Sequence, residues 1–169
     1  MNQKEEAGMA INGINHAVLY VRDARRTQKF YSDVLGFTTV IDHPQASYVF
    51  MRAPDSKNHH DIAFFTIGAD KGPSQAGRST VGMYHIAWEV PTLADLEQLR
   101  EKLTHAGVLV GQTDHGVNKS LYAHDPDGLE FEVTWIVPAK EWGAMEDQAI
   151  IEPLDMVAER RKFEALGYK

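Results

Sequence analysis

Hydrophobic and polar residues alternate in two short stretches of the chain, and each stretch carries one histidine. The first stretch, INHAVLYV, begins at Ile14 and contains His16, and the second, YHIAWEV, begins at Tyr84 and contains His85. Alternation with a period of two predicts β-strands. The two histidines lie 69 positions apart, and the residues around them follow the same pattern. This recurrence predicts two copies of one structural unit.

A helical pattern follows each of these strands and ends at a glycine. In the first copy Asp23 is placed to cap the helix, and Gly36 can adopt the left-handed conformation that ends it. In the second copy Thr92 and Asp95 have the spacing of a capping box, and Gly107 ends the helix. Residues at helical spacing form one mainly apolar face on each predicted helix. These residues are Thr27, Phe30, Tyr31, Val34 and Leu35 in the first helix, and Leu93, Leu96, Leu99 and Leu103 in the second.

Strand-like segments complete both copies. They cover residues 37–42, 47–52 and 61–67 in the first copy, and 108–112, 117–124 and 129–137 in the second. The chain is therefore predicted to be an α+β protein whose single domain, residues 14–137, holds two βαβββ modules. Module 1 covers residues 14–68 and module 2 covers residues 81–137, with residues 69–80 as linker. Residues 1–13 form an N-terminal extension, and residues 138–169 form a C-terminal extension with some helix.

Composition narrows the classes of function. The chain has 17 Lys and Arg against 24 Asp and Glu, a formal charge of −7, which argues against a nucleic-acid partner. No apolar run approaches the roughly 20 residues that span a bilayer, and the acidic N-terminus does not resemble a signal peptide. We therefore expect a soluble, cytoplasmic protein with no membrane partner. Cysteine is absent, so the chemistry must use histidine, carboxylate, tyrosine or serine, and the eight histidines are the main candidates.

The two strand histidines are the first candidates for a functional site. A polar imidazole in an apolar strand needs a hydrogen bond or a metal ion. A single histidine of this kind is most often a satisfied core or surface residue. His16 and His85, however, occupy equivalent positions of a duplicated unit, and a pseudo-twofold axis would bring them to one concave surface. We therefore expect the two imidazoles to meet.

A carboxylate on a neighbouring strand is the expected third member. In the predicted strand 129–137 the residues alternate between an apolar face directed toward the helices and an inward face. The apolar face carries Leu129, Phe131, Val133 and Trp135, and the inward face carries Glu130, Glu132, Thr134 and Ile136. One carboxylate facing two histidines makes a set that favours non-haem Fe(II) and also admits Mn(II). Alternatively, both glutamates line a solvated face, and spacing alone leaves the two interpretations open.

Four segments of the sequence together resemble a known family. HAVLYVRDARRTQKFYSDVLGF, HHDIAFF, YHIAWEV and LYAHDPDGLEFEV are similar to the vicinal-oxygen-chelate superfamily, and most similar within it to the small type I extradiol (catechol 2,3-) dioxygenases. The similarity covers about residues 14–137. It implies a curved, barrel-like mixed sheet with the helices outside. The DPDG turn is shared across the superfamily, whereas HHDIAFF combined with DHGVNKSLYAHDPDG points to the extradiol branch.

This resemblance implies specific site residues. Residue by residue, it assigns metal binding to His16, His85 and Glu132. It also implies that three further residues handle protons and form hydrogen bonds with the substrate or oxygen, namely His60, His115 and Tyr122. Strand parity predicts that Tyr122 lies opposite Glu132 if the connection between their strands spans the five residues 125–129 with a bulge, whereas a four-residue connection would turn Tyr122 away.

The same resemblance implies the reaction and the partners. We expect an Fe(II) cofactor, with Mn(II) as the alternative metal, and a catechol-type substrate whose aromatic ring is cleaved by O₂. The resemblance also implies a homodimer or a higher homo-oligomer.

Other functions on the same fold remain open from the sequence. A fosfomycin-resistance-type transferase uses two histidines and one glutamate as well, but gives no necessary role to His60, His115 and Tyr122. A glyoxalase-like isomerase would need a fourth ligand, a carboxylate from the last strand of module 1, and Ala63 occupies the position 69 residues before Glu132. A non-catalytic binding protein, similar to those that sequester bleomycin, needs no metal ligands.

Overall fold

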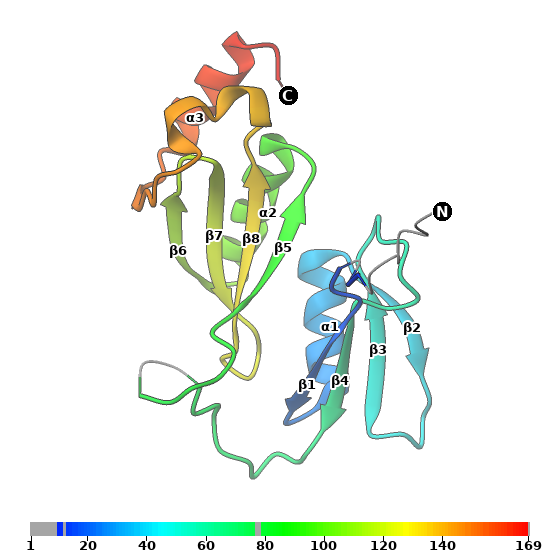
Figure 1. The fold of residues 1–169 in the computed structure, drawn as a ribbon. Coiled ribbons are helices and arrows are strands. Elements are labelled where there is room, and N and C mark those ends of the chain that lie inside the picture. The colour runs from blue at the N-terminus through cyan, green and yellow to red at the C-terminus, as the bar shows by residue number, and fades with distance from the viewer. Residues whose placement is uncertain (1–9, 12, 77–78, 169) are drawn as a thin grey trace, which may run out of the picture.

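The computed structural model describes residues 10, 11, 13–76 and 79–168 of the 169-residue chain. Most of the predicted N-terminal extension, and positions 77 and 78 of the predicted linker, lie outside the described residues. The described chain forms two βαβββ modules followed by a C-terminal segment (Figure 1). The predicted α+β class and the order of elements in both modules are confirmed.

Module 1 is a four-stranded sheet with one helix packed against it. Its elements are β1 (Ala17–Val21), α1 (Ala24–Leu35), β2 (Thr38–Asp42), β3 (Tyr48–Arg52) and β4 (Ile62–Thr66). The strand order is β1-β4-β3-β2, in which β1 and β4 run parallel and the other neighbours run antiparallel. Strand β1 therefore forms one edge of this sheet.

Module 2 repeats this arrangement. Its elements are β5 (Ile86–Val90), α2 (Leu93–His105), β6 (Leu109–Asp114), β7 (Asn118–His124) and β8 (Glu130–Ile136). The strand order is β5-β8-β7-β6, and the short β9 (Glu152–Pro153) adds to the β6 edge. Strand β5 and the first residue of α2 lie 69 positions after β1 and the first residue of α1, as the sequence repeat predicts.

Both long helices begin at the predicted capping residues. The Asp23 carboxylate accepts hydrogen bonds from backbone N–H groups at the start of α1, and Gly36 ends that helix with a φ of 76°. The Thr92 hydroxyl accepts a hydrogen bond from the backbone N–H of Asp95 at the start of α2. These contacts satisfy N–H groups that have no partner within the helix. Local sequence signals therefore set where each helix starts.

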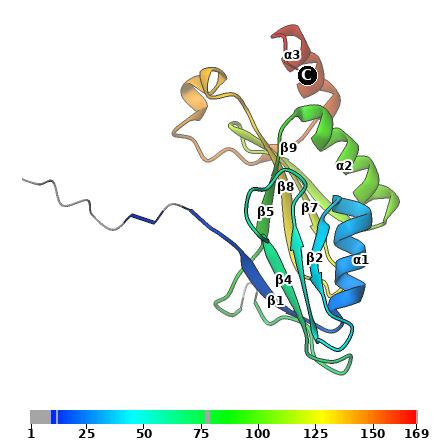
Figure 2. The same ribbon diagram turned by 90° about the vertical axis from the view of Figure 1, so that its right-hand side faces the viewer.

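The two helices lie next to each other on the same side of the two sheets (Figure 2). Each helix buries its apolar face against its own sheet, and Phe30 of α1 packs against both hydrophobic cores. The Phe131 ring of β8 lies 6.0 Å from the Phe30 ring and 6.2 Å from the Tyr31 ring, measured between centroids. Aromatic side chains therefore join the two modules on their helical side.

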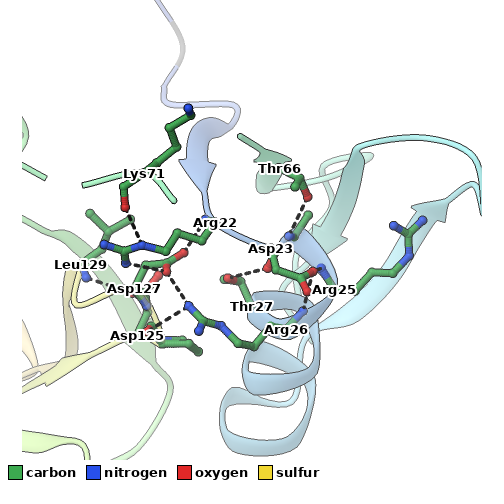
Figure 3. A network of polar contacts seen from close by, with 12 residues as sticks. Arg22, Asp23, Arg25, Arg26, Thr27, Thr66, Lys71, Asp125, Asp127 and Leu129 are labelled. Atoms are coloured by element: carbon green, nitrogen blue, oxygen red, sulfur yellow. Dashed lines mark hydrogen bonds and ion pairs between the residues drawn. The ribbon is translucent and has the colours of Figure 1, made fainter. Parts of the chain in front are cut away.

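A polar network also joins the modules (Figure 3). Asp127, in the DPDG turn of module 2, accepts a hydrogen bond from the Arg22 backbone N–H at 2.8 Å and forms ion pairs with Arg22 and Arg26. The Asp125 carboxylate accepts hydrogen bonds from the backbone N–H groups of Asp127 and Leu129 at 2.8 and 2.9 Å. The turn is thus internally braced and attached to the junction between β1 and α1.

The C-terminal segment packs on module 2. It contains two 3-10 turns, η1 (Ala139–Glu141) and η2 (Gly143–Met145), then β9 and the helix α3 (Met156–Ala165). Leu154, Met156 and Phe163 are buried in the core of module 2. The segment is therefore attached both through its β9 pairing and through apolar side chains.

The fold agrees with the expected class of two βαβββ modules with mixed sheets. The described strands form two separate sheets, and β1 and β5 each lie at a sheet edge. The modules contact each other through aromatic side chains, including Phe37 of module 1 and Trp88 of module 2 with ring centroids 4.9 Å apart, and through the arginine contacts of Asp127. Within the described ranges, no helix has the length and apolar character that crossing a bilayer requires.

Candidate metal-binding and proton-transfer site

His85 and Glu132 form a close pair in module 2. His85 directly precedes β5, and Glu132 lies on β8, which runs parallel beside β5 with Ala87 as the neighbour of Glu132. The His85 Nε2 atom is 3.0 Å from the Glu132 Oε2 atom. Glu132 is only 7% exposed, which makes its carboxylate oxygens strong acceptors in a region with little water. The sheet register therefore holds one imidazole and one carboxylate together.

Two buried polar atoms at this pair, which could bind a metal ion, have no hydrogen-bond partner in the described part of the chain. The Ser120 hydroxyl donates to Glu132 Oε1 and so orients the carboxylate from the neighbouring strand β7. His85 Nδ1 and Glu130 Oε1 are 3.6 Å apart, and both are buried with no hydrogen-bond partner in the described part of the chain. Imidazole nitrogens and carboxylate oxygens are the ligands that divalent iron and manganese accept. The pair thus fits a metal ion in the kind of atoms that it offers.

Tyr122 and His115 lie beside this pair. Tyr122 is directly opposite Glu132 in the antiparallel pairing of β7 and β8, which confirms the register predicted for a five-residue connection. The Tyr122 hydroxyl oxygen is 2.9 Å from His115 Nε2, and the Tyr122 ring centroid is 5.7 Å from that of His85. Burial, followed by the charge of Glu132, raises the pKa of Tyr122 to about 12. Tyr122 therefore keeps its proton near neutral pH.

His16 and His60 form a second group in module 1. Their ring centroids are 4.5 Å apart, and the His60 ring also contacts Phe50 at 4.8 Å. Burial lowers the pKa of His60, and the neighbouring His16 and His59 lower it further. The His16 ring is exposed and its Nδ1 atom lies 2.8 Å from the side-chain oxygen of Asn15. His60 is thus held among rings, while His16 faces solvent.

The structure therefore brings the expected residues together in two groups. His85, Glu132, Tyr122 and His115 meet in module 2, and His16 and His60 meet in module 1. Among the residues that the structure describes, no three His, Cys, Asp or Glu side chains converge closely enough to hold a metal ion. The residue types therefore suit a metal ion, but the three side chains do not converge on one point, because His16 lies beside His60 in module 1.

A cavity of about 420 Å³ lies between the modules, next to His85. Val18 and Tyr20 of β1 line it on one side, and Met83 and Glu130 line it together with His85. Most of the lining side chains are apolar or aromatic, and the polar ones include His85 and Glu130. Such a lining suits a small, flat and largely apolar molecule with a few polar atoms.

Sequence reasoning missed two parts of this site. Ser120 lies two residues before Tyr122 on the same face of β7, so strand parity could have identified it. The backbone carbonyl of Ile150 lies 2.9 Å from His115 Nδ1. A backbone acceptor has no side-chain signature, so no pattern in the sequence indicates this contact.

Comparison with known proteins relates the chain to a large family. Residues 13–133 match the model of the Glyoxalase/Bleomycin resistance protein/Dioxygenase superfamily. Biphenyl-2,3-diol 1,2-dioxygenase 3 of Rhodococcus globerulus is 35% identical over 127 residues, which are 70% of this chain and 60% of that protein. Catechol-2,3-dioxygenase of Bacillus subtilis strain 168 is 28% identical over 132 residues, which are 76% of this chain and 43% of that protein. The chain spans about half the length of the curated relatives it matches.

Solved structures show the same fold. A glyoxylase/bleomycin resistance protein/dioxygenase domain from Frankia sp. EAN1pec has a TM-score of 0.64 at 20% identity, covering 77% of this chain and 96% of that one. The fosfomycin resistance protein FosX of Mesorhizobium loti has a TM-score of 0.54 at 20% identity, covering 78% of this chain and 98% of that one. The family model covers more than half of the sequence, and the duplicated βαβββ fold agrees with it. The chain therefore belongs to the Glyoxalase/Bleomycin resistance protein/Dioxygenase superfamily.

Proposed function

We propose that this protein is an extradiol-type dioxygenase that uses O₂ to cleave the ring of a catechol-type substrate. His16, His85 and Glu132 would hold a divalent ion, Fe(II) or alternatively Mn(II). A metal bound there would offer positions to the diol and to O₂ and would lower the pKa of a diol hydroxyl. The names of the relatives from Rhodococcus and Bacillus, both dioxygenases of aromatic diols, support this reaction class.

The observation that carries this proposal is the position of Tyr122 and His115 beside the His85–Glu132 pair. Extradiol cleavage needs groups that accept a proton from the diol and return one to the oxygen atoms. Tyr122 is protonated at neutral pH and lies within hydrogen-bond distance of His115. The two residues thus provide a proton donor connected to a proton acceptor next to the ligand pair.

The cavity beside His85 supports an aromatic substrate. Val18, Tyr20 and Met83 offer apolar surface for a ring, while Glu130 and His85 supply polar atoms at the wall. His60 belongs to module 1 and has a lowered pKa, so it is neutral near pH 7 and able to accept a hydrogen bond or a proton. The cavity wall itself contains His85 and Glu130 but not His60, so His60 would act on a diol from outside this wall.

In the proposed enzyme, His16 comes from a second copy of the chain. His16 is exposed, and module 1 does not hold it beside His85 and Glu132. The outer edges of β1 and β5 carry no neighbouring strand in the described ranges, so another chain can approach both. A twofold dimer would create two equivalent sites, each with ligands from both copies. This assembly agrees with the homodimer that the family resemblance implies.

Co-production of two inactive variants tests this assembly. His16→Ala and His85→Ala are each expected to lack activity when produced alone. In a mixed dimer with shared sites, one site receives both intact histidines, so random pairing restores about one quarter of the wild-type activity. Activity that stays at background, in a mixture shown to contain mixed dimers, would place all three ligands within one chain.

Anaerobic reconstitution tests the reaction itself. Purified protein is loaded with Fe(II), mixed with a panel of catechols and exposed to O₂, while oxygen uptake and absorbance of the yellow ring-opened product are recorded. We expect uptake and product with at least one diol, and loss of both in Glu132→Gln. His105→Ala, at the end of α2, serves as a matched histidine control. The absence of uptake with every diol would favour the transferase or isomerase alternatives.

The isomerase alternative has less support from the site. Ala63, at the module 1 position that corresponds to Glu132, is fully buried on β4 and offers no ligand atom. The carboxylate that a glyoxalase-like site would use as its fourth ligand is therefore missing from that position.

A further inference from the structure

The C-terminal segment makes a polar contact with the proposed proton-handling residues. The Ile150 carbonyl oxygen lies 2.9 Å from His115 Nδ1, and the Tyr122 hydroxyl lies 2.9 Å from the other ring nitrogen, Nε2. Ile150 lies outside both modules, in the chain between η2 and β9. His115 is therefore held between a backbone group of the C-terminal segment and a side chain of β7.

The chemistry of these two contacts assigns the ring proton. A carbonyl oxygen only accepts hydrogen bonds, so His115 Nδ1 must carry the proton in the contact with Ile150. In the neutral imidazole the other nitrogen, Nε2, is then an acceptor. The Tyr122 hydroxyl must consequently donate to Nε2. Tyr122 thus donates a hydrogen bond to His115, and His115 donates one to the Ile150 carbonyl oxygen.

We propose that the Ile150 carbonyl is a positioning group that fixes the tautomer of His115, so that Nε2 is always free to accept the Tyr122 proton. The C-terminal segment is then a functional part of the site. The same logic, a base oriented by a third group, recurs in enzymes whose catalytic histidine must present one particular nitrogen. The role of the tautomer in catalysis rests on the proposed dioxygenase function, whereas the tautomer itself does not.

The segment around Ile150 is anchored close to His115. Glu152 pairs with Asp114, the residue before His115, in the antiparallel contact of β9 with β6. Gly116, the residue after His115, has a φ of 76°, and a Cβ atom added there would lie 2.7 Å from the Ile150 Cδ1 atom. The loop and the segment are therefore in direct contact on both sides of His115. This limits how far the carbonyl can move from the ring.

A buried lysine links α3 to the same loop. Lys119 is 1% exposed, and its Nζ atom lies 2.5 Å from Asp114 Oδ1 and 3.1 Å from Glu159 Oε2 of α3. Asp114 Oδ1 also accepts a hydrogen bond from the Gly116 backbone N–H at 2.7 Å. Buried ion pairs of this kind are costly to break from one side. The anchoring thus combines charge, backbone pairing and apolar contact.

The tautomer is measured directly by NMR on metal-free protein without substrate. Uniformly ¹⁵N-labelled protein is examined at about pH 8.5, where a histidine of ordinary pKa is neutral, and His115→Gln identifies the His115 ring signals. We expect the chemical shifts of a protonated Nδ1 and an unprotonated Nε2. A His115 ring that is protonated at Nε2 overturns the proposal. The result does not depend on ring cleavage, so failure of the dioxygenase assignment would leave it standing.

Two variants identify the group that sets the tautomer. Tyr122→Phe removes the hydroxyl, and we expect the tautomer to persist because Ile150 determines it. Replacing Ile151 by its α-hydroxy analogue turns the Ile150 carbonyl into an ester carbonyl, a weaker acceptor. We expect this change to produce a mixture of tautomers and to lower kcat by roughly three- to tenfold, about the value of one hydrogen bond, with little change in KM.

The matched control is lactic acid in place of Ala149, which weakens the Gln148 carbonyl instead. We expect its tautomer and its kcat to match wild type. An amide ¹H–¹⁵N spectrum of each variant verifies the fold before the ring is examined. A tautomer that changes in Tyr122→Phe, or that stays unchanged in the folded Ile151 ester, contradicts the proposed role of the carbonyl.

Discussion

The two modules share one backbone plan and differ in the polar groups that they place on it. In module 2, His85 lies 3.0 Å from Glu132 on the adjacent parallel strand. In module 1, the residue that corresponds to Glu132 is Ala63, and His16 contacts the His60 ring instead. Duplication of the unit thus supplies equivalent positions, and single side chains decide which copy provides the carboxylate.

The two modules also differ in what supports their histidines. Glu132 receives a hydrogen bond from Ser120, and His115 receives support from the C-terminal segment. His16 is exposed and has Asn15 as its polar contact. Module 2 therefore holds His85 and Glu132 in place. We propose that His16 joins them from a second copy of the chain.

The largest expected effect follows from removing the carboxylate that distinguishes module 2. Glu132→Gln keeps the shape and removes the charge. Loss of a group that supports a metal ligand already costs about 10- to 100-fold, so loss of a ligand is expected to exceed 100-fold in kcat/KM. Steady-state oxygen uptake measures it, with the exposed strand glutamate Glu89→Gln as control. Comparable losses in both variants would show that Glu132 has no special role.

A second prediction concerns the contact that joins the modules. The Asp127 carboxyl is 6% exposed and pairs with Arg22 and Arg26, which are 26% and 48% exposed. Because both arginines remain partly solvated, Asp127→Ala should lower the free energy of unfolding by about 2 kcal/mol, below the full cost of breaking a buried pair. Urea denaturation provides the measurement.

Asp33→Ala is the matched control for this prediction. Asp33 pairs with Lys29 one turn away on α1, and both side chains are largely exposed. Its loss should cost less than about 0.5 kcal/mol. If Asp127→Ala is no more destabilising than Asp33→Ala, the turn does not fix the arrangement of the modules.

A third prediction examines the support of Glu132 within module 2. Ser120→Ala removes the hydroxyl that donates to Glu132 Oε1. We expect Fe(II) affinity to fall about tenfold, the lower end of the range for groups that orient a metal ligand. Anaerobic titration with Fe(II) measures the affinity, with Ser32→Ala of α1 as control. Unchanged affinity in Ser120→Ala would mean that the carboxylate is oriented by other contacts.

The smallest expected effect is a dependence of stability on pH. Burial and the charge of Glu132 raise the folded-state pKa of Tyr122 to about 12, above the ordinary tyrosine pKa of about 10. Between these values the folded protein binds more protons than the unfolded chain, so stability is complete below pH 10 and declines toward pH 12. Tyr122→Phe should make this decline shallower in denaturant titrations. Tyr20→Phe, an exposed tyrosine of β1, is the control and should leave the decline as in wild type.

Periodicity, caps and strand parity were sufficient to predict both modules. Asp23 and Thr92 cap the helices as expected, because capping is a contact between close neighbours in sequence. Strand parity predicted that Tyr122 faces Glu132 if the connection spans the five residues 125–129, and the structure has this connection and this pairing. These features depend on residues that are close together in the sequence, so the sequence alone is sufficient to predict them.

The relation between the modules could not be predicted in the same way. The pseudo-twofold argument led us to expect His16 beside His85, but the described chain holds His16 against His60. The arrangement depends on contacts between segments that are distant in sequence, such as Arg22 with Asp127. A single sequence contains many possible ion pairs of this kind and does not indicate which of them form. The contact of His115 with Ile150 escaped prediction because the acceptor is backbone.

Fe(II) binding by the separate histidine variants tests the central claim most directly. Anaerobic isotherms are recorded for wild type, His16→Ala, His85→Ala and the surface control His105→Ala. We predict one Fe(II) per chain in wild type and His105→Ala, and an affinity lower by more than about 100-fold in both other variants, because each removes one ligand of a three-residue set. If His16→Ala binds Fe(II) as tightly as wild type, the two modules do not share one metal and the proposed site is wrong.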